Sequence, residues 1–588
     1  MAVAVAEERP VVAQRHLSRD PLIWIGVVSG IFIGLALMAD ARPNVEELLL
    51  RIDIGGAVMV VLMAGWSRSA DWIAKALRFS PQQSSRYFRH DTLAGTTALL
   101  TIFFALGATF GAPQIACLVL LMFTARAAAL WLVLAPKQRD ELLASNGWLA
   151  FLFLISGFAA LIYQIVWQRA LFAAFGVNIE SITIIVSLFM FGLGIGSIFG
   201  GFVAGRFPEK APALFFVCEL CIGLFGCVSL PLIEKVAHLT LHASLPVVAA
   251  AIFALLCIPT LFMGATLPIL VGHLFRHYRN LGQSVGILYA INTVGSALAC
   301  FLTADLLFVF AGERAAIAVA VICNFAVGIL AGRYAWRTAR QFRPLPSSTA
   351  AAPANVENAG RDFLWLVILF FSAATGYVSL SQEIVWMRII GYMNGGAPTV
   401  FAHMLGCFLI GVAGGALFGE KWCVRNAARK PQPMLFIGIM LIASAAFYYL
   451  STAGLTELLT WKWVMAQYAT YAIVAATSFL LGGIFTVLCH YGARASQAAG
   501  VTVSRIYLAN IIGCTLGPIL TGFVLMQYIT TDRIVLYLAA GTALLGGLAL
   551  LFAPRLRILG AIVAAACIAG MFAIHPPAYH DFLARLQS

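Results

Sequence analysis

The 588-residue sequence carries very little charge: only 10% of its residues are Asp, Glu, Lys or Arg, whereas 62% are hydrophobic. A soluble protein of this length needs far more charged residues to cover its surface. A soluble protein is therefore excluded, and the mean hydropathy of +0.94 agrees with this conclusion. Apolar runs of about 20 residues, long enough to cross a hydrocarbon core as helices, recur along the whole sequence.

The sequence also lacks the short motifs of common cofactor and metal sites. It contains no Walker loop, no H-E-x-x-H, no C-x-x-C-H and no G-x-G-x-x-G after a strand. Cys218 and Cys221 form a C-x-x-C inside an apolar run, without a second pair or a nearby His, so buried thiols are favoured over a metal site. We expect no metal, no cofactor and no soluble catalytic domain in this chain.

The excess of basic residues gives a formal net charge of +13. Nucleic acid binding is one interpretation, but Lys and Arg also accumulate in the cytoplasmic loops of membrane proteins. Basic loops such as 68–89 and 333–361 alternate with short, nearly neutral loops along the whole chain. The alternation favours no nucleic acid partner and predicts a bacterial inner-membrane protein with a cytoplasmic N-terminus. The first apolar run, 21–38, has no cleavage site after it and is expected to be a retained span.

Seventeen helical spans are predicted from the apolar runs. They start near residues 21, 54, 93, 113, 147, 179, 211, 243, 284, 314, 361, 398, 433, 464, 502, 533 and 556. An odd number of spans places the C-terminal tail outside the cytoplasm.

The sequence contains an internal repeat, which fixes architecture. The segment Q-I-V-W-Q-R at 164–169 returns as E-I-V-W-M-R at 383–388, an offset of 219 residues (383 − 164). Three glycines spaced by four at 192–200 return at 411–419 with the same offset. Y-x-x-N-x-x-G at 289–295 returns at 507–513, an offset of 218 (507 − 289). A duplicated unit of six helices explains these matches.

Six is an even number, so both copies enter the membrane from the same side and are parallel, like the two halves of major facilitator transporters. The expected fold is an all-α polytopic membrane protein with a major facilitator-like core. The expected regions are a four-helix membrane region at 1–140, a first repeat at 141–340, a cytoplasmic linker at 341–360, a second repeat at 361–555, and a C-terminal helix and tail at 556–588.

Ionisable side chains inside membrane spans are costly, so they are candidates for function. The candidate cation or proton sites are Glu383, Glu219 and Asp305. Glu383 and Trp386 share a helix face and could together hold a cation, although an interhelical structural bond explains them equally well. Gln164 occupies the position in the first repeat that Glu383 occupies in the second, and it is a further candidate.

Further candidates occur in both repeats. Trp167 and Trp386, with Arg169 and Arg388, are expected to shape the outer mouth of a cavity between the repeats, each Arg bonding to another helix or reaching the interface. The two copies of the Y-x-x-N motif contribute four polar residues. A role in structural hydrogen bonds is the favoured interpretation and contact with a ligand is the alternative for Tyr289, Asn292, Tyr507 and Asn510. The spaced glycines allow close helix packing, and a sliding interface between moving parts is the alternative.

Four segments carry a family resemblance: S-G-F-A-A-L-I-Y-Q-I-V-W-Q-R (156–169), G-L-G-I-G-S-I-F-G-G (192–201), F-M-G-A-T-L-P (262–268) and G-I-L-Y-A-I-N-T-V-G (286–295). Together they resemble the membrane portion of spermidine synthase-like membrane proteins, which fuse a major facilitator-like domain with an aminopropyltransferase. The resemblance covers about 400 residues and implies the membrane fold. The family commonly has Glu where this chain has Gln164. Its soluble domain has no counterpart in this sequence, so polyamine synthesis is not implied.

Two functions remain open. The first is a major facilitator-like transporter or exporter of a small cationic or amphipathic metabolite, embedded in the lipid bilayer, with its site between the repeats. The second is a non-catalytic membrane scaffold that binds a separate soluble enzyme, such as an aminopropyltransferase, through the basic loops 68–89 and 333–361. An enzyme activity within the membrane is not expected, because no cluster of acid, base or metal-ligand residues faces either aqueous side.

Overall fold

The structure is a computed structural model that describes residues 145–175, 179–240, 242–278, 280–341, 358–393, 399–426, 432–461, 463–492, 499–553 and 557–578, with 73, 80, 82–84, 87 and 133–134. The chain divides into two compact units, Met1–Leu142 and Leu143–Ser588. The four spans predicted before residue 140 belong to the first unit and lie for the most part outside the described residues, as do linker residues 342–357 and the tail beyond residue 578. The account below concerns the second unit.

Thirteen helices in the described residues are long and apolar enough to cross a membrane. The first six are α6 (Asn146–Phe175), α7 (Ile179–Arg206), α8 (Ala211–Leu239), α9 (Leu245–Tyr278), α10 (Leu281–Leu302) and α12 (Gly312–Gln341). The next six are α13 (Asn358–Met393), α14 (Thr399–Arg425), α15 (Pro433–Trp461), α16 (Trp463–Gly492), α17 (Ala499–Pro518) and α19 (Thr531–Leu551), and α20 (Arg557–Ala578) follows. Each helix starts within three residues of its predicted position.

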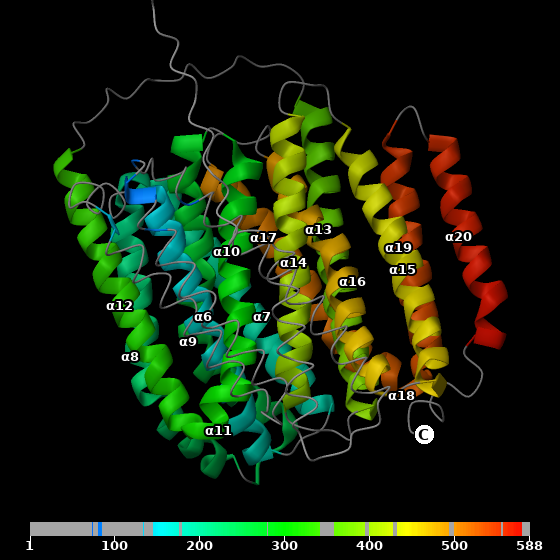
Figure 1. Ribbon diagram of the computed structural model, residues 1–588, viewed down its shortest axis with the longest axis horizontal. Coiled ribbons are helices and arrows are strands. Elements are labelled where there is room, and N and C mark those ends of the chain that lie inside the picture. The colour runs from blue at the N-terminus through cyan, green and yellow to red at the C-terminus, as the bar shows by residue number, and fades with distance from the viewer. Residues whose placement is uncertain are drawn as a thin grey trace, which may run out of the picture. The chain divides into compact units, whose positions relative to one another are not determined.

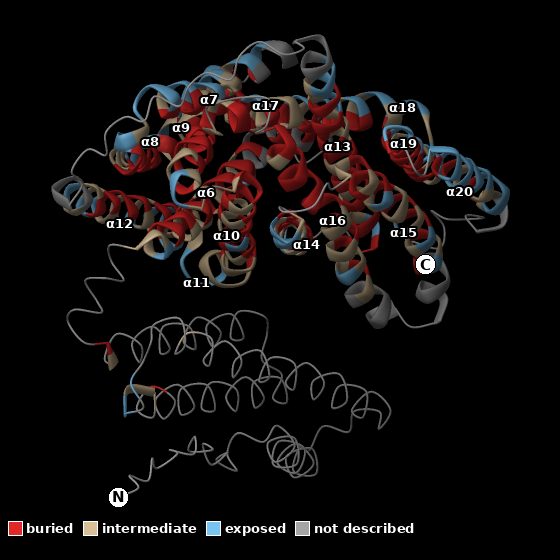
Figure 2. Ribbon diagram, turned by 90° about the horizontal axis from the view of Figure 1, so that it is seen from above, coloured by how far each residue is buried: buried red, intermediate tan, exposed pale blue. Residues whose placement is uncertain are grey.

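The helices form two neighbouring bundles, α6–α12 and α13–α19, which we call the first and second halves (Figures 1 and 2). The halves meet where α10 packs on α14 and α7 packs on α17. Helix α20 packs on α19 and α15 at the edge of the second half. We call the end where α6 and α13 begin the proximal end, which the sequence predicts to be cytoplasmic, and the opposite end the distal end.

The fifth helix of each half continues through a π-helical segment. Helix α10 continues through η3 (Thr303–Leu307) into the short α11 (Phe308–Phe310), and α17 continues through η5 (Ile519–Leu525) into α18 (Met526–Tyr528). Both π segments end at matching positions of the repeat (525 − 307 = 218). A π segment rotates the side chains that follow it and often marks a functional site, so both halves change helix geometry at the same depth.

The spaced glycines of the repeat pack within each half. A Cβ atom at Gly192, Gly196 or Gly200 would clash with α9, and one at Gly411, Gly415 or Gly419 would clash with α16 of the second half. These glycines therefore let α7 approach α9, and α14 approach α16, in the manner of small-residue contacts between membrane helices. Packing was the favoured interpretation of these glycines. The alternative was a sliding interface between moving parts, but the glycines lie within each half and not between the halves.

Other glycines face the opposite half. A Cβ atom at Gly201 on α7 would clash with Ser504 on α17, and one at Gly286 on α10 would lie 2.6 Å from the Cβ atom of Glu420 on α14. The halves therefore touch through closely approaching backbones near the proximal end.

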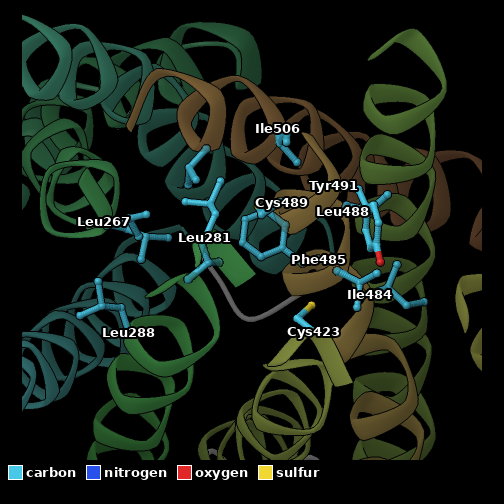
Figure 3. Packing of buried hydrophobic residues seen from close by; sticks show 14 of the residues in the cluster. Leu267, Leu281, Leu288, Cys423, Ile484, Phe485, Leu488, Cys489, Tyr491 and Ile506 are labelled. Carbon is cyan, nitrogen blue, oxygen red and sulfur yellow. The ribbon is translucent and has the colours of Figure 1, made fainter. Parts of the chain in front are cut away.

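Two hydrophobic clusters join the halves. At the proximal end, Leu281 on α10 packs with Cys423, Phe485 and Ile506 of the second half (Figure 3). At the distal end, Cys300 at the end of α10 belongs to a cluster with second-half residues that include Met404 on α14. Apolar contacts thus join the halves at both ends of the space between them.

Candidate functional site

A cavity of about 220 Å³ lies between the halves, lined by side chains from ten helices. Its walls are mostly apolar, with contributions such as Phe189 on α7 and Phe408 on α14. A few polar side chains interrupt these walls. This is the composition of a small-molecule site, in which apolar walls provide contact and a few polar groups fix orientation.

Glu383 on α13 is the only charged side chain among the described residues that line the cavity. It is only 5% exposed, and no described residue forms a hydrogen bond or ion pair with its carboxylate. Its repeat counterpart Gln164, on α6, is 6% exposed and lines the same cavity from the first half. A buried charge without a partner is costly, so the carboxylate needs a cation or a proton from the contents of the cavity.

A row of three aromatic rings lines the cavity toward its proximal end. The Tyr289 ring lies 5.3 Å from the Phe485 ring, which lies 5.7 Å from the Tyr507 ring. Tyr289 belongs to the first half, and Phe485 and Tyr507 belong to the second. The two repeat-related tyrosines therefore meet across one phenylalanine, and the row offers π faces and two hydroxyl groups to a bound molecule.

Asn292 and Asn510 make the same bond in the two halves. The Asn292 side chain donates to the Phe153 carbonyl at 3.0 Å, and Asn510 donates to the Ser372 carbonyl at 3.0 Å. Each bond ties the fifth helix of a half to its first helix. Both amides also line the cavity, so they hold the helices together while remaining within reach of a ligand.

Glu219 on α8 lies behind the cavity wall. Its side chain is 0% exposed, and each carboxylate oxygen accepts one hydrogen bond. Ser156 on α6 donates to Oε1 at 2.5 Å, and Asn324 on α12 donates to Oε2 at 2.7 Å. Ser156 and Asn324 line the cavity, whereas Glu219 does not. The predicted ion site at Glu219 is therefore one layer removed from the cavity.

Asp305 bridges the halves. The His403 Nε2 atom on α14 lies 2.9 and 3.0 Å from the two carboxylate oxygens of Asp305 in η3. Both side chains are mostly buried, at 25% and 13% exposure. Asp305 is not among the residues that line the cavity. It ties the halves together at the distal end, where its segment packs on α14, and no described residue other than His403 pairs with it.

A family model for the Major Facilitator Superfamily matches residues 148–518, which is 371 of the 588 residues (518 − 148 + 1). The chain belongs to this superfamily. It is accordingly a multi-pass membrane transporter of the superfamily, and the thirteen described spans agree with this assignment. The match does not extend to the narrower spermidine synthase-like resemblance, which stays a prediction. No curated protein matches the chain.

Solved structures of other transporters resemble the chain. They are FucP in the outward conformation (15% identity, TM-score 0.44, covering 69% of this chain and 98% of FucP), the POT family transporter PepTSo (13%, 0.47, 70% and 98%) and a variant of the nucleoside transporter NupG (13%, 0.46, 69% and 99%).

The two tryptophans of the superfamily core do not shape an outer mouth, contrary to the prediction. Trp167 and Trp386 are each 1% exposed, and neither lines the cavity. Trp167 stacks on Tyr163 of its own helix, and Trp386 packs edge-on against Tyr448 of α15. Their large rings fill the interior of their own halves. Trp386 and Glu383 consequently do not form the joint cation site that their shared helix face suggested.

The two arginines also lie away from the cavity. Arg169 pairs with Glu313 of α12 at 2.8 Å, with side chains 49% and 35% exposed, and its guanidinium lies over Phe308. Arg388 donates to the Tyr392 hydroxyl of its own helix at 3.5 Å. Arg169 thus bonds to another helix, which is one of the two predicted alternatives, whereas the hydrogen bond of Arg388 stays within its own helix; neither side chain lines the cavity.

Sequence reasoning missed Ser156, Asn324 and His403 as partners of the acids. Ser156 was visible in the repeat motif, and His403 was visible as a polar residue in an apolar span. The pairings themselves join residues 63 to 105 positions apart in sequence, and nothing in one sequence indicates them. No group of three metal-ligating side chains occurs in the part of the chain that the structure describes.

Proposed function

We propose that this transporter moves a small organic molecule with a single positive charge across the bacterial inner membrane. The observation that carries the proposal is the Glu383 carboxylate, which faces the cavity without a partner among the described residues. A cation bound there supplies the charge that the protein does not. One carboxylate in the cavity favours one positive charge, whereas a polyamine would leave its other ammonium groups unpaired.

The size and lining of the cavity support a small amphipathic substrate. About 220 Å³ is less than the roughly 300–1,000 Å³ of pockets for drug-sized ligands. The aromatic row formed by Tyr289, Phe485 and Tyr507 provides faces for an apolar or cationic group. Gln164, Asn292 and Asn510 provide hydrogen bonds from both halves.

The contacts between the halves support alternating access. The cluster around Leu281 and Phe485 closes the proximal end, and the Asp305–His403 pair with the cluster around Met404 closes the distal end. Opening either set while the other holds would expose the cavity to one side at a time. The proximal end then faces the cytoplasm if the N-terminus is cytoplasmic, as the loop charges predict.

Purified full-length protein in proteoliposomes tests this proposal. The assay is counterflow of radiolabelled monoamines and small quaternary ammonium ions, with diamines and neutral alcohols of similar size in parallel. We expect exchange of at least one monocation. Glu383→Gln should weaken its binding roughly tenfold to a hundredfold, because a hydrogen bond to a charged group contributes about 1.5–3 kcal/mol.

Two further variants act as controls. Glu234→Gln removes an exposed acid of α8 that does not line the cavity and should leave exchange unchanged. Gln164→Glu adds a second acid to the cavity and should shift preference from monoamines toward diamines. Equal exchange by wild type and Glu383→Gln, or exchange of neutral compounds alone, would contradict the proposed substrate class.

The scaffold hypothesis remains distinct. The basic loops 68–89 and 333–361, which would dock a soluble enzyme, lie for the most part outside the described residues. A stable complex with a soluble enzyme after gentle detergent extraction, together with no exchange of any compound, would favour the scaffold. The enclosed cavity with its unpartnered acid is what makes transport the better supported function.

A further inference from the structure

Glu219 is a buried acid whose hydrogen-bond partners are both neutral. The titratable groups that face it are the Tyr163 hydroxyl on α6, the Cys218 thiol on its own helix and the Cys323 thiol on α12. No Lys, Arg or His among the described residues pairs with it. An isolated charge on a buried side chain within the membrane is costly, so the Glu219 carboxylate must be neutralised by a mobile cation or proton.

Both partners of Glu219 can form a hydrogen bond with either its charged or its protonated form. The Ser156 hydroxyl can donate to a carboxylate or accept from a carboxylic acid, and the Asn324 amide offers a donor at one atom and an acceptor at the other. The Asn324 Oδ1 atom is buried and has no partner in the described structure. Rotation of the amide would place this oxygen against a protonated Glu219 Oε2. Lys or Arg partners would instead fit only the charged form.

The second half shows that packing of the third helix on the sixth does not require this acid. Pro212 and Pro433 begin matching stretches of α8 and α15 at an offset of 221 (433 − 212), which places Met440 at the position of Glu219. Glu313 and Asp532 match at an offset of 219 (532 − 313), which places Ala543 at the position of Asn324.

The counterpart of Ser156 is Thr375, whose hydroxyl donates to the Phe371 carbonyl of its own helix at 2.8 Å. The contact between α8 and α12 therefore recurs between α15 and α19 without an acid or its two donors, whereas α13 does not pack on α15 as α6 packs on α8. The α8–α12 contact does not need the polar trio.

The trio connects directly to the cavity. Ser156 and Asn324 each contact Glu219 on one side and line the cavity on the other. A proton can therefore move without passing through apolar side chains: the Ser156 hydroxyl gives its proton to Glu219 Oε1 and takes another from the cavity. The carboxylate becomes a carboxylic acid, the hydroxyl is restored, and the reverse sequence releases the proton.

We propose that Glu219, with Ser156 and Asn324, is a proton-binding site that exchanges protons with the central cavity and couples proton movement to transport. This site is separate from Glu383, which lies on the second half. The proton site does not depend on the proposed substrate, whereas the coupling role rests on the transport function proposed above.

Infrared difference spectroscopy of the full-length protein in lipid nanodiscs tests the proton site. Spectra are recorded from about pH 4 to about pH 9, a range that includes buried carboxyl groups. We expect a carboxylic acid C=O band that titrates in the wild type and is absent in Glu219→Gln. Ser156→Ala should shift the band to higher frequency and change its midpoint, because one donor to the carboxyl is lost.

Two controls keep this result decisive. Glu219→Met introduces the apolar residue found at the matching position of the second half, and it should remove the same band. Glu420→Gln should leave the band in place. The inference is overturned if neither Glu219 variant changes the titrating bands while both remain folded, since Glu219 then keeps one protonation state throughout.

The coupling role is tested with the monoamine that the wild type exchanges best. Glu219→Gln should retain counterflow and lose accumulation driven by an imposed pH gradient. Undiminished accumulation in this variant would overturn the coupling role. If the wild type exchanges no amine, the substrate proposal fails, and the infrared result still decides whether Glu219 binds an exchangeable proton.

Discussion

At the scale of single residues, Asn292 and Asn510 show how one side chain can be both structural and close to the site. Each donates to a carbonyl of the first helix in its own half, and each lines the cavity. Gly157 and Gly376 lie at these crossings, where a Cβ atom would collide with the asparagine of the neighbouring helix. The repeat thus preserves a glycine and an asparagine together, because the glycine allows the approach that the asparagine bond needs.

Replacing either asparagine by alanine should lower stability by similar amounts. Hydrogen bonds between membrane helices contribute about 0.6 kcal/mol on average and up to about 1.7 kcal/mol. We expect Asn292→Ala and Asn510→Ala each to lose an amount in this range, measured by unfolding in mixed detergent micelles. A variant with unchanged stability but impaired exchange would show that its asparagine acts mainly on the ligand.

Agreement or difference between the two repeats does not by itself separate the cavity residues from the packing residues. Gln164 and Glu383 differ, and both line the cavity. Trp167 and Trp386 are identical in the two repeats and pack inside their own halves. Asn292 and Asn510 are also identical in the two repeats, and both line the cavity. Helix periodicity alone could not separate Glu383 from Trp386, because the neighbouring helices that each side chain faces are set by the tertiary arrangement.

At the scale of elements, α7 carries two kinds of glycine on two faces. Gly196 faces α9 within the first half, and Gly201 faces α17 of the second half. The first contact is part of a bundle that stays together in any conformation, whereas the second exists only while the proximal end is closed. The spans and their starts were predictable because each apolar run has the length of a membrane helix. The neighbouring helix that each glycine faces was not predictable, since glycine has no side chain whose character indicates its surroundings.

Alanine at these two positions should have different effects. Gly196→Ala should reduce stability by about 1–3 kcal/mol, the usual cost of added volume in a packed interior. Gly201→Ala should leave stability almost unchanged and disfavour proximal closure. Thermal unfolding measures the first effect. Alkylation of Cys423, which is buried in the proximal cluster, measures the second, resolved by peptide mass spectrometry. Faster Cys423 alkylation in Gly196→Ala than in Gly201→Ala would contradict this assignment.

At the scale of the whole molecule, the two ends of the cavity are closed by different chemistry. At the proximal end the halves meet through apolar packing, close backbones and a hydrogen bond from the Gly282 N–H to His490 Nδ1, whereas the distal end adds the Asp305–His403 pair between two side chains. The duplication predicted two similar halves and their parallel arrangement. It could not predict this difference, because neither Asp305 nor His403 has an ionisable counterpart: Phe523 matches Asp305 (523 − 305 = 218), and Ile184 matches His403 (403 − 184 = 219).

Loss of the Asp305–His403 pair should favour opening at the distal end. A pair of this kind contributes roughly 1 kcal/mol, so His403→Leu should raise the open fraction about fivefold. The rate at which a membrane-impermeant maleimide, applied from the distal side, alkylates the cavity-lining thiol of Cys514 measures this open fraction and should rise in the variant.

Arg169→Gln provides the matched control for this measurement. It breaks an ion pair that lies within the first half and is largely exposed, and it should not change the Cys514 rate. An unchanged rate in His403→Leu would show that the apolar cluster alone keeps the distal end closed.

Fusion of the two halves into one chain permits an asymmetry that a pair of identical six-helix chains cannot have. Identical chains around a twofold axis must present every residue twice, so an acid at the position of Glu383 would always face a second one at the position of Gln164. In this chain only the second copy has the acid in the cavity, Glu383, and only the first copy has the acid behind the cavity wall, Glu219. Each copy has inherited the shape of its twin and a different share of its chemistry, so exchanging one copy for the other would preserve the bundle and erase a site.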